Sequence, residues 1–184
     1  MAILPTRSRA KVYRMTQSLT LVALTNPKSP TNVGSVLRAA GCFGVDEVLY
    51  SGTRYDMAKK FQTDTKAVHN RIPLTNVEDF FSAPSAPLTR VCVDLIEGAT
   101  ALGDFVHPER ALYIFGPEDG SLSQAVIDQA DAVVYIPTIG CLNLAATVNI
   151  VLYDRAAKLN LVPGGDRLIQ TSRDTNNKTN HGGR

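Results

Sequence analysis

The sequence predicts an α/β fold in which a mainly parallel sheet is flanked by helices. Apolar runs rich in β-branched and aromatic residues alternate along the chain with segments of helical periodicity, and turn residues separate the two. Length and composition agree with this prediction. The 184 residues are enough for one domain with a sizeable core, and 44% hydrophobic with 20% charged residues is ordinary for a globular protein.

The first three elements are a strand, a helix and a second strand. LTLVALT (19–25) is an apolar run that ends at turn residues, which is typical of a buried strand. Apolar residues then recur at helical spacing over about 31–43, and Gly44 is placed to cap the C-terminus of that helix. EVLYSG (47–52) predicts the next strand.

The middle of the chain gives weaker signals. Residues 53–89 predict two short helices, at about 55–61 and 76–82. The SAPSAP run that ends at Pro87 is rich in Pro and Ser and predicts a loop.

The C-terminal half returns to clear alternation. RVCVDLI (90–96) and ALYIFG (111–116) predict strands, and SLSQAVIDQA (121–130) predicts an amphipathic helix. AVVYIP (132–137) predicts the last strand. The final helix is expected over 142–161, with its apolar face at Leu144, Val148, Val151 and Leu152.

Charge is segregated along the chain although the net charge is only +2. Residues 1–75 carry eleven basic and four acidic residues, a net of +7, residues 76–140 carry a net of −8, and residues 141–184 carry +3. Such segregation favours a surface that faces a polyanion, and nucleic acid is the usual candidate. The basic residues of the first segment include Arg7, Arg9, Lys11 and Arg14.

The two ends of the chain are expected to lie outside the folded domain. Residues 1–18 form a basic arm, which either grips phosphates or is merely solvated. The domain itself is expected over 19–162. Residues 163–184 are polar, and the stretch 171–184 contains no apolar residue, so we expect a disordered tail that cannot offset its ordering entropy.

Several function classes are disfavoured by what the sequence lacks. It has no apolar run of about 18 residues and no secretory h-region, so we expect neither a membrane span nor export. Cys42, Cys92 and Cys141 are too far apart for a structural zinc site, and we expect reduced thiols in a cytoplasmic protein. GxGxxG and GxxxxGK[ST] motifs are absent, and the histidines are scattered, which argues against dinucleotide, P-loop and hydrolase sites.

Three loops that follow predicted strands carry the candidate chemistry, because ligands bind beyond the carboxyl ends of strands in open α/β sheets. These loops are TNPKSPTN, GPEDGS and PTIGCLN. Each is weak evidence alone. GPEDG can be a tight turn whose acids cap a helix, and Asn143 can simply cap the last helix.

Taken together, the segments resemble the SpoU/TrmH family of RNA ribose 2′-O-methyltransferases, within the SPOUT superfamily. The resemblance rests on Asn32-x-Gly34-x3-Arg38 at the start of the first helix and on the segment from ALYIFGPEDG to NIVLYDRA (111–156). It covers roughly residues 20–160. It implies an α/β fold with a C-terminal trefoil knot built from about 111–160, the cofactor S-adenosylmethionine (AdoMet), and a homodimer whose site is completed across the interface.

The resemblance also assigns cofactor-binding residues. Gly116 ends a strand where the backbone approaches the cofactor, which suits a residue without a side chain. Ile136 and Leu142, together with Leu95, are expected to line the adenine pocket. The product is S-adenosylhomocysteine, and no metal ion is expected.

Five residues are implied to act in catalysis. Glu118 matches the motif glutamate beside the cofactor and Asn32, and Asn143 matches the asparagine that begins the last helix. Arg38 matches the arginine that acts on the target ribose hydroxyl, reaching the cofactor of the partner subunit. The family pattern usually reads Ser-Leu-Asn, whereas this chain has Cys141 in place of the serine. A thiol is a weaker hydrogen-bond partner, so either Cys141 takes over that role or the role has moved.

Two glycines flank the expected catalytic arginine on the outer face of its helix. Gly34 and Gly41 each cost about 1 kcal/mol of helix propensity relative to alanine. They would leave Arg38 in a shallow groove that a ribose-phosphate or the partner chain can approach. Helix packing at the dimer interface is a compatible alternative.

The implied reaction is an in-line attack of a ribose 2′-oxygen on the sulfonium methyl group, for which the protein supplies alignment and help with the proton. Arginine is normally a permanent cation, so Arg38 is expected to orient the hydroxyl and stabilise the developing alkoxide, while the general base stays open. We expect tRNA as the substrate. The alternatives are rRNA, a catalytically silent RNA-binding member of the family, and, without positive support, a methyltransferase acting on protein or a small molecule.

Overall fold

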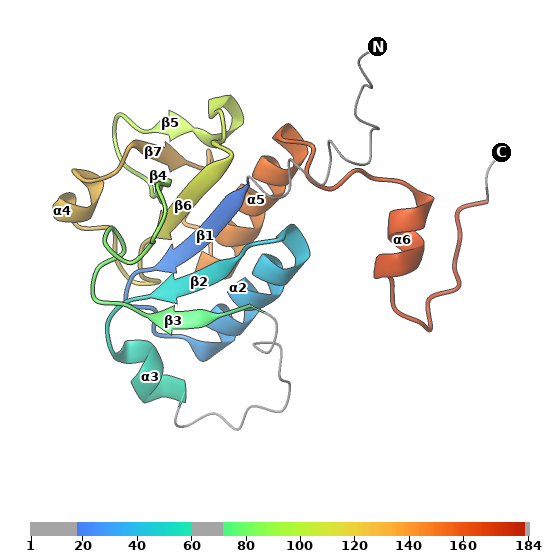
Figure 1. Ribbon diagram of the computed structural model, residues 1–184, viewed down its shortest axis with the longest axis horizontal. Helices are drawn as coiled ribbons and strands as arrows, with labels where there is room; N and C mark the ends of the chain where they lie inside the picture. Colours follow the sequence, from blue (N-terminus) through green and yellow to red (C-terminus); the bar gives the residue numbers. More distant parts are fainter. Residues whose placement is uncertain (1–17, 60–71, 183–184) are drawn as a thin grey trace, which may run out of the picture.

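A parallel sheet carries the fold in the computed structural model, which describes residues 18–59 and 72–182 (Figure 1). Its strands are β1 (Leu19–Leu24), β2 (Glu47–Tyr50), β3 (Leu74–Asn76), β4 (Thr89–Val93), β5 (Thr100–Ala101), β6 (Arg110–Phe115) and β7 (Ala132–Tyr135). They form one seven-stranded sheet in the order β3-β2-β1-β6-β4-β7-β5. Every pairing between these described strands is parallel, which confirms the predicted α/β class.

The helices and turns of the described chain vary widely in length. They are α2 (Pro30–Phe43), α3 (Arg54–Lys59), the 3-10 turn η2 (Leu102–Asp104), α4 (Gln124–Ile127), α5 (Leu144–Lys158) and α6 (Asp166–Ser172). The two long helices, α2 and α5, pack side by side on one face of the sheet (Figure 1). α6 lies apart from the sheet.

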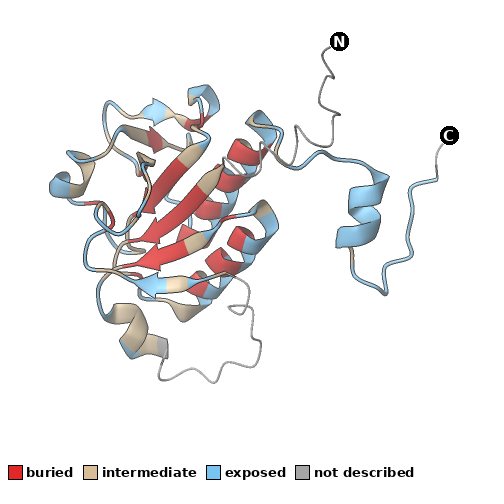
Figure 2. Cartoon of the chain, in the orientation of Figure 1, coloured by how far each residue is buried: buried red, intermediate tan, exposed pale blue. Residues whose placement is uncertain are grey.

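The core forms on both faces of the sheet because the central strands alternate their side chains between them. Val22 and Tyr113 belong to the cluster that packs against α2 and α5, whereas Leu21 and Ile114 belong to a second cluster that includes the buried Phe80. Figure 2 shows the buried residues concentrated on the central strands and on the inner sides of the two long helices. Burying one such aliphatic side chain contributes about 1.5–3 kcal/mol.

The ends of α2 follow the sequence signals closely. Ser29 is the N-cap, and its hydroxyl accepts a hydrogen bond from the backbone N–H of Asn32. Pro30 occupies the first turn, where its missing N–H costs nothing. Gly44 caps the C-terminus in the left-handed conformation, with φ of 68°, as predicted. The helix is therefore fixed at the end that faces the loop after β1.

The structure corrects the prediction of a helix over 76–82. Leu74–Asn76 forms the edge strand β3, and residues 80–82 form a turn. Side chains of the strand bond to β2 and its following loop: Thr75 Oγ1 donates to Glu47 Oε1 (2.6 Å), and Asn76 Nδ2 donates to the Gly52 backbone carbonyl (3.2 Å). These partners are distant in sequence, so no local pattern could reveal them.

Three further differences concern short elements. β5 was not predicted, because a strand as short as Thr100–Ala101 carries no readable periodicity. The helix expected over 121–130 is confined to Gln124–Ile127. The α6 helix, which has no buried residue, lies within the segment 163–184 that we expected to be disordered, and that expectation stays a prediction. The basic arm lies within residues outside the described ranges.

A buried histidine ties the loop before β6 to the second half of α5. His107 Nδ1 lies 2.7 Å from Tyr113 Oη, and Nε2 lies 2.8 Å from Asp154 Oδ2. Burial lowers the pKa of His107, outweighing the opposite effect of the Asp154 carboxylate. A neutral ring whose Nε2–H donates to Asp154 and whose Nδ1 accepts from the Tyr113 hydroxyl satisfies all three groups. This arrangement anchors α5 at the end opposite to Asn143.

This anchor predicts a defined pH dependence of stability. Because the folded-state pKa of His107 lies below its unfolded value of about 6.5, the unfolded chain binds the extra proton as the pH falls. The contribution is therefore complete above about pH 6.5 and is lost as the pH falls toward the folded-state pKa. Urea unfolding at pH 7.5 and 5.5 should show that His107→Asn flattens this dependence, whereas exposed His181→Asn should leave it as in the wild type. If the free energy of unfolding changes equally between the two pH values in the wild type and both variants, His107 does not cause the pH dependence.

Candidate functional site

A cavity of about 410 Å³ opens where β4, β6 and β7 end. The last residues of these strands, Val93, Phe115 and Tyr135, form its floor together with the loops that follow them. This is the edge of the sheet at which ligands bind in open α/β folds. Six of the predicted site residues line the cavity: Leu95, Gly116, Glu118, Ile136, Cys141 and Leu142.

Glu118, in the loop after β6, is a carboxylate that accepts three hydrogen bonds from the start of α2 and the residues before it. One oxygen accepts from the backbone N–H of Lys28 (3.0 Å), and the other accepts from the backbone N–H of Ser29 (3.1 Å) and from Asn32 Nδ2 (3.0 Å). Burial raises the pKa of Glu118, but these hydrogen bonds outweigh it, so the pKa lies below its ordinary value. Its position at the N-terminus of α2 also favours the anion.

Asn32 links Glu118 to the last long helix. Its Nδ2 donates to Glu118, and its Oδ1 accepts from Asn143 Nδ2 at 3.1 Å. Asn143 is also the N-cap of α5, because its Oδ1 accepts from the backbone N–H of Ala145 (2.9 Å) and Ala146 (3.4 Å). The two readings that the sequence left open for Asn143, helix cap and site residue, therefore describe the same side chain.

The Glu118–Asn32–Asn143 network joins three segments that are far apart in the sequence. It connects the loop after β6, the start of α2 and the start of α5. Each amide is used at both its oxygen and its nitrogen, so the orientation of both side chains follows from their partners. The structure thus brings together three of the five predicted catalytic residues.

Asp94 is a site residue that the sequence analysis missed. It directly follows β4 and lines the cavity, its Oδ1 accepting from the Leu95 backbone N–H (2.8 Å) and its Oδ2 from the Leu122 backbone N–H (2.7 Å). It thereby ties the loop after β4 to the loop after β6. The predicted strand over 90–96 included Asp94, whereas β4 ends at Val93, and a carboxylate interrupting an apolar run was the signal available in the sequence.

Gly116 lies where these two loops meet. A Cβ atom at this position would sit 3.4 Å from the Leu122 backbone nitrogen and 3.5 Å from Asp94 Oδ2. A methyl group would be in contact with the loop, and a larger side chain would fill part of the cavity. Gly116 lines the cavity, and its expected approach to the cofactor stays a prediction.

The cysteines differ sharply in their surroundings. Cys141 is an exposed free thiol in the loop before α5, at the cavity wall. Cys92 is buried in the middle of β4, where burial and then the nearby Asp94 raise the pKa of its thiol to about 12. Of these two, only Cys141 is placed to contact a ligand in the cavity.

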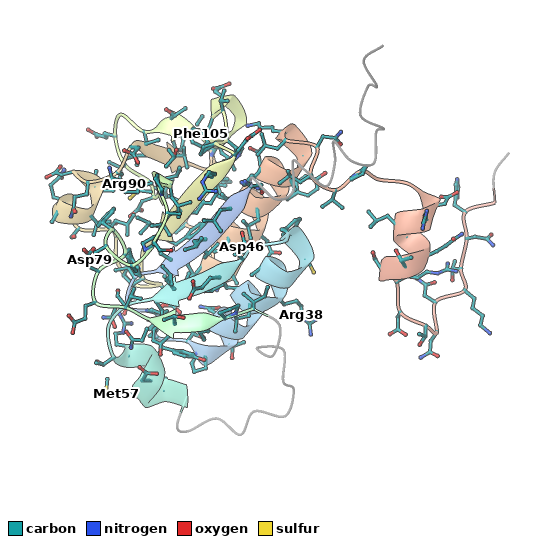
Figure 3. All side chains as sticks on the ribbon, viewed as in Figure 1. Arg38, Asp46, Met57, Asp79, Arg90 and Phe105 are labelled. Carbon is teal, nitrogen blue, oxygen red and sulfur yellow. The ribbon has the colours of Figure 1, made fainter. Side chains whose placement is uncertain are left out.

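Arg38 is not brought to the cavity within one chain. It is exposed, and Figure 3 shows it on the outer side of α2, directed away from the sheet. Added Cβ atoms at Gly34 and Gly41 would meet no atom within 4 Å, so contacts in the described part of this chain do not require either glycine. The predicted Arg7, Arg9, Lys11 and Arg14 lie outside the described residues.

Residues 18–59 and 72–182 contain neither a candidate metal cluster nor a membrane-spanning helix. No group of three or more His, Cys, Asp or Glu side chains there could hold a metal ion. No helix in the same ranges is long and apolar enough to cross a membrane.

The sequence from residue 19 to 153 matches the model of the SpoU rRNA Methylase family. No curated protein matches the chain at a significant level. Among solved structures, the chain is similar to the SpoU methyltransferase AviRb from Streptomyces viridochromogenes in complex with AdoMet, at 21% identity and a TM-score of 0.61 over 78% of this chain. The chain spans only 59% of the length of AviRb.

Two other similar structures are matched over nearly their whole length. The A. aeolicus TrmH/SpoU tRNA modifying enzyme is 18% identical, with a TM-score of 0.65 over 89% of this chain and 92% of its own. A protein described for 2-OH methylation of C/U34 on tRNA is 21% identical, with a TM-score of 0.66 over 78% of this chain and 92% of its own. At these identities the similarity establishes a shared fold.

The carboxylate of Glu118 yields a prediction about stability. Glu118→Gln replaces one acceptor oxygen by an N–H donor that faces other donors, so it should lower the free energy of unfolding by about 2 kcal/mol at pH 7. Since the folded-state pKa is lowered, this difference should be complete above about pH 4.5 and shrink as the pH falls further. Urea unfolding measures it.

The matched control is Glu78→Gln, the same substitution at an exposed position outside the network. It should change the free energy of unfolding by less than about 0.5 kcal/mol. Equal effects of the two substitutions would show that the hydrogen bonds of Glu118 contribute nothing specific.

Proposed function

The chain belongs to the SpoU rRNA Methylase family, and on this premise we propose that it transfers a methyl group from AdoMet to a ribose 2′-hydroxyl of RNA, with tRNA as the substrate. One observation carries the proposal. The residues expected to bind the cofactor, which come from the segments after β4, β6 and β7, line one cavity next to the Glu118–Asn32–Asn143 network.

The cavity fits AdoMet in size and chemistry. Its volume of about 410 Å³ lies in the range of small-molecule sites. Leu95 and Leu142 are 53% and 40% exposed at its wall, and a bound adenine would cover such apolar side chains together with Ile136. When bound, AdoMet supplies an activated methyl group on a sulfonium, and that chemistry requires no metal ion. Within the proposal, S-adenosylhomocysteine is the product.

The chain's own residues hold and shape the site. Glu118 and Asn32 fix the loop after β1 against the loop after β6, and Asn143 fixes the start of α5 beside them. Asp94 holds the Leu95 backbone at the cavity wall. Cys141 would contact the cofactor or the RNA in the position of the family serine.

Arg38 requires a second copy of the chain in this proposal. It would orient the ribose hydroxyl and stabilise the developing alkoxide as a fixed cation. The proton of the hydroxyl would pass to water or to an RNA phosphate. Because Arg38 lies outside the cavity of its own chain, we propose a homodimer in which it reaches the cavity of the partner. Ile150 and Tyr153, which are 37% and 66% exposed on α5, support an interface on this face.

Several finer features belong to the same proposal. They are the trefoil knot implied for about 111–160, the basic arm 1–18 as an RNA contact, the polar tail 163–184 and a cytoplasmic location. The tRNA class is supported by two similar structures, the A. aeolicus TrmH/SpoU tRNA modifying enzyme and the protein described for 2-OH methylation of C/U34 on tRNA. An rRNA substrate is the second candidate, because the matching family is described by rRNA methylation.

The proposed function is tested with radiolabelled AdoMet and unmodified total RNA that is separated by size after incubation. Label in the tRNA band, released on digestion as a 2′-O-methylated nucleoside, is the expected result. Label in rRNA would keep the chemistry and replace the substrate class. Cofactor binding without label in any RNA would refute catalysis and favour a silent RNA-binding protein.

Substitution of Arg38 tests its proposed role. Arg38→Ala should lower methyl transfer at least about 100-fold while AdoMet affinity stays within about twofold, because the residue acts on the substrate hydroxyl. Mixing this variant with an Asn32→Ala variant should restore part of the activity, since a mixed dimer pairs an intact Arg38 with an intact network. Arg90→Ala, at a half-buried arginine of β4 far from Arg38 in Figure 3, is the control. Loss of AdoMet binding in Arg38→Ala would instead indicate a structural role.

A further inference from the structure

Two cations and one carboxylate form a cluster at the rim of the cavity. Lys28, in the loop after β1, places Nζ 3.1 Å from Asp119 Oδ2. Arg54, at the start of α3, places Nη2 3.0 Å from both oxygens of Asp119. Asp119 itself lines the cavity and directly follows Glu118. The carboxyl ends of β1, β2 and β6 therefore bring these three side chains to one place.

The backbone beneath the two cations is fixed. The N–H of Lys28 donates to Glu118 Oε2, and the N–H of Arg54 donates to Asn26 Oδ1 at 3.4 Å. Asn26 has a positive φ of 43°, and a Cβ added to Gly52 would lie 2.3 Å from its Oδ1. The loops after β1 and β2 thus interlock, which fixes the backbone from which the two side chains extend without the help of Asp119.

Asp119 neutralises only one of the two positive charges in the cluster. The Glu118 carboxylate is occupied by Asn32 and by two backbone N–H groups at the N-terminus of α2, so Asp119 is the carboxylate that contacts both cations. The cluster is open to water, with side-chain exposures of 47% for Lys28, 29% for Arg54 and 49% for Asp119. Ion pairs this exposed contribute little to stability, so a competing anion can exchange with the carboxylate.

We propose that Lys28 and Arg54 are a binding site for an RNA phosphate group, and that Asp119 occupies this site until the phosphate displaces it. The inference rests on the proposed function. A guanidinium and an ammonium that hold a carboxylate can hold a phosphate in the same way. The location is suitable, because a ribose that enters the cavity carries its flanking phosphates past the rim. Asp119 then discriminates against weakly bound anions, since any ligand must replace it.

The two possible roles of Asp119 predict opposite results. If Asp119 is a displaceable occupant, Asp119→Asn should tighten the binding of unfractionated tRNA about fivefold at low salt, because a like charge near the phosphate is removed. Arg54→Gln and Lys28→Gln should weaken it, each lowering the slope of log affinity against log salt by about 0.7. If Asp119 is only a structural clamp, Asp119→Asn should weaken tRNA binding together with the two cation variants, and that outcome would overturn the inference.

Asp131→Asn is the matched control. Asp131 pairs with Arg90 through Nε (3.0 Å) and Nη2 (2.9 Å) at the amino ends of β4 and β7, the edge of the sheet opposite to the cavity. Like Asp119→Asn, the substitution removes one carboxylate and frees a partly exposed arginine. Because this arginine is far from the cavity, tRNA affinity should stay within about 1.5-fold if only a local phosphate site matters. Equal tightening by both substitutions would mean that net charge alone acts, and would also overturn the inference.

Tritium-labelled AdoMet separates this inference from the proposed function. If the wild-type protein methylates tRNA but Asp119→Asn binds tRNA no more tightly than the wild type does, the phosphate site is refuted and the proposed function stands. Wild-type protein that binds AdoMet but neither methylates nor binds RNA would refute both. AdoMet affinity and thermal unfolding of each variant confirm that the effects on tRNA come from folded protein.

Discussion

The hydrogen-bonded chain Glu118–Asn32–Asn143 is the interaction on which the arrangement of the site depends. The sheet alone brings the carboxyl ends of its strands to one edge, but it leaves the loops there free to take many paths. Glu118 fixes the path of the chain after β1 through the backbone N–H groups of Lys28 and Ser29. Asn143 begins α5 and bonds to Asn32 at the same time. A single connected set of polar groups therefore sets both the starts of the two long helices and the wall of the cavity, and each amide in it is hydrogen-bonded at both its oxygen and its nitrogen.

Elements with signals in their own sequence were predicted, whereas elements held by residues far away in the chain were not. β1, β4 and β6 were recognised because buried parallel strands are continuous apolar runs, and α2 because its apolar residues recur at helical spacing and Gly44 marks its end. β3 and β5 escaped recognition because such short strands are held by neighbours far away in the chain. Intrinsic strand propensity gives little information about such short strands.

The same distinction applies to the site. Glu118, Asn143 and the apolar residues of the cavity were predicted because they lie within motifs of fixed spacing. The pairing of Asp119 with Lys28 and Arg54 was not predicted, since it joins residues from three strand ends and has no local signature. The position of Arg38 relative to the cavity also depends on an assembly that one chain does not contain. Family motifs therefore identified the inner residues of the site and gave no information about its rim.

The central pairing of the sheet has a consequence for how the protein is made. β1 pairs along its whole length with β6, so that Leu19 lies opposite Arg110 and Leu24 opposite Phe115. On the ribosome, β1 is synthesised early and its inner edge stays without a partner until β6 has emerged. The network is completed later still, when Asn143 leaves the exit tunnel. A nascent chain thus completes the network only after Asn143 has emerged, and an interrupted translation product that ends before residue 143 lacks the bond that joins Asn32 to the last long helix.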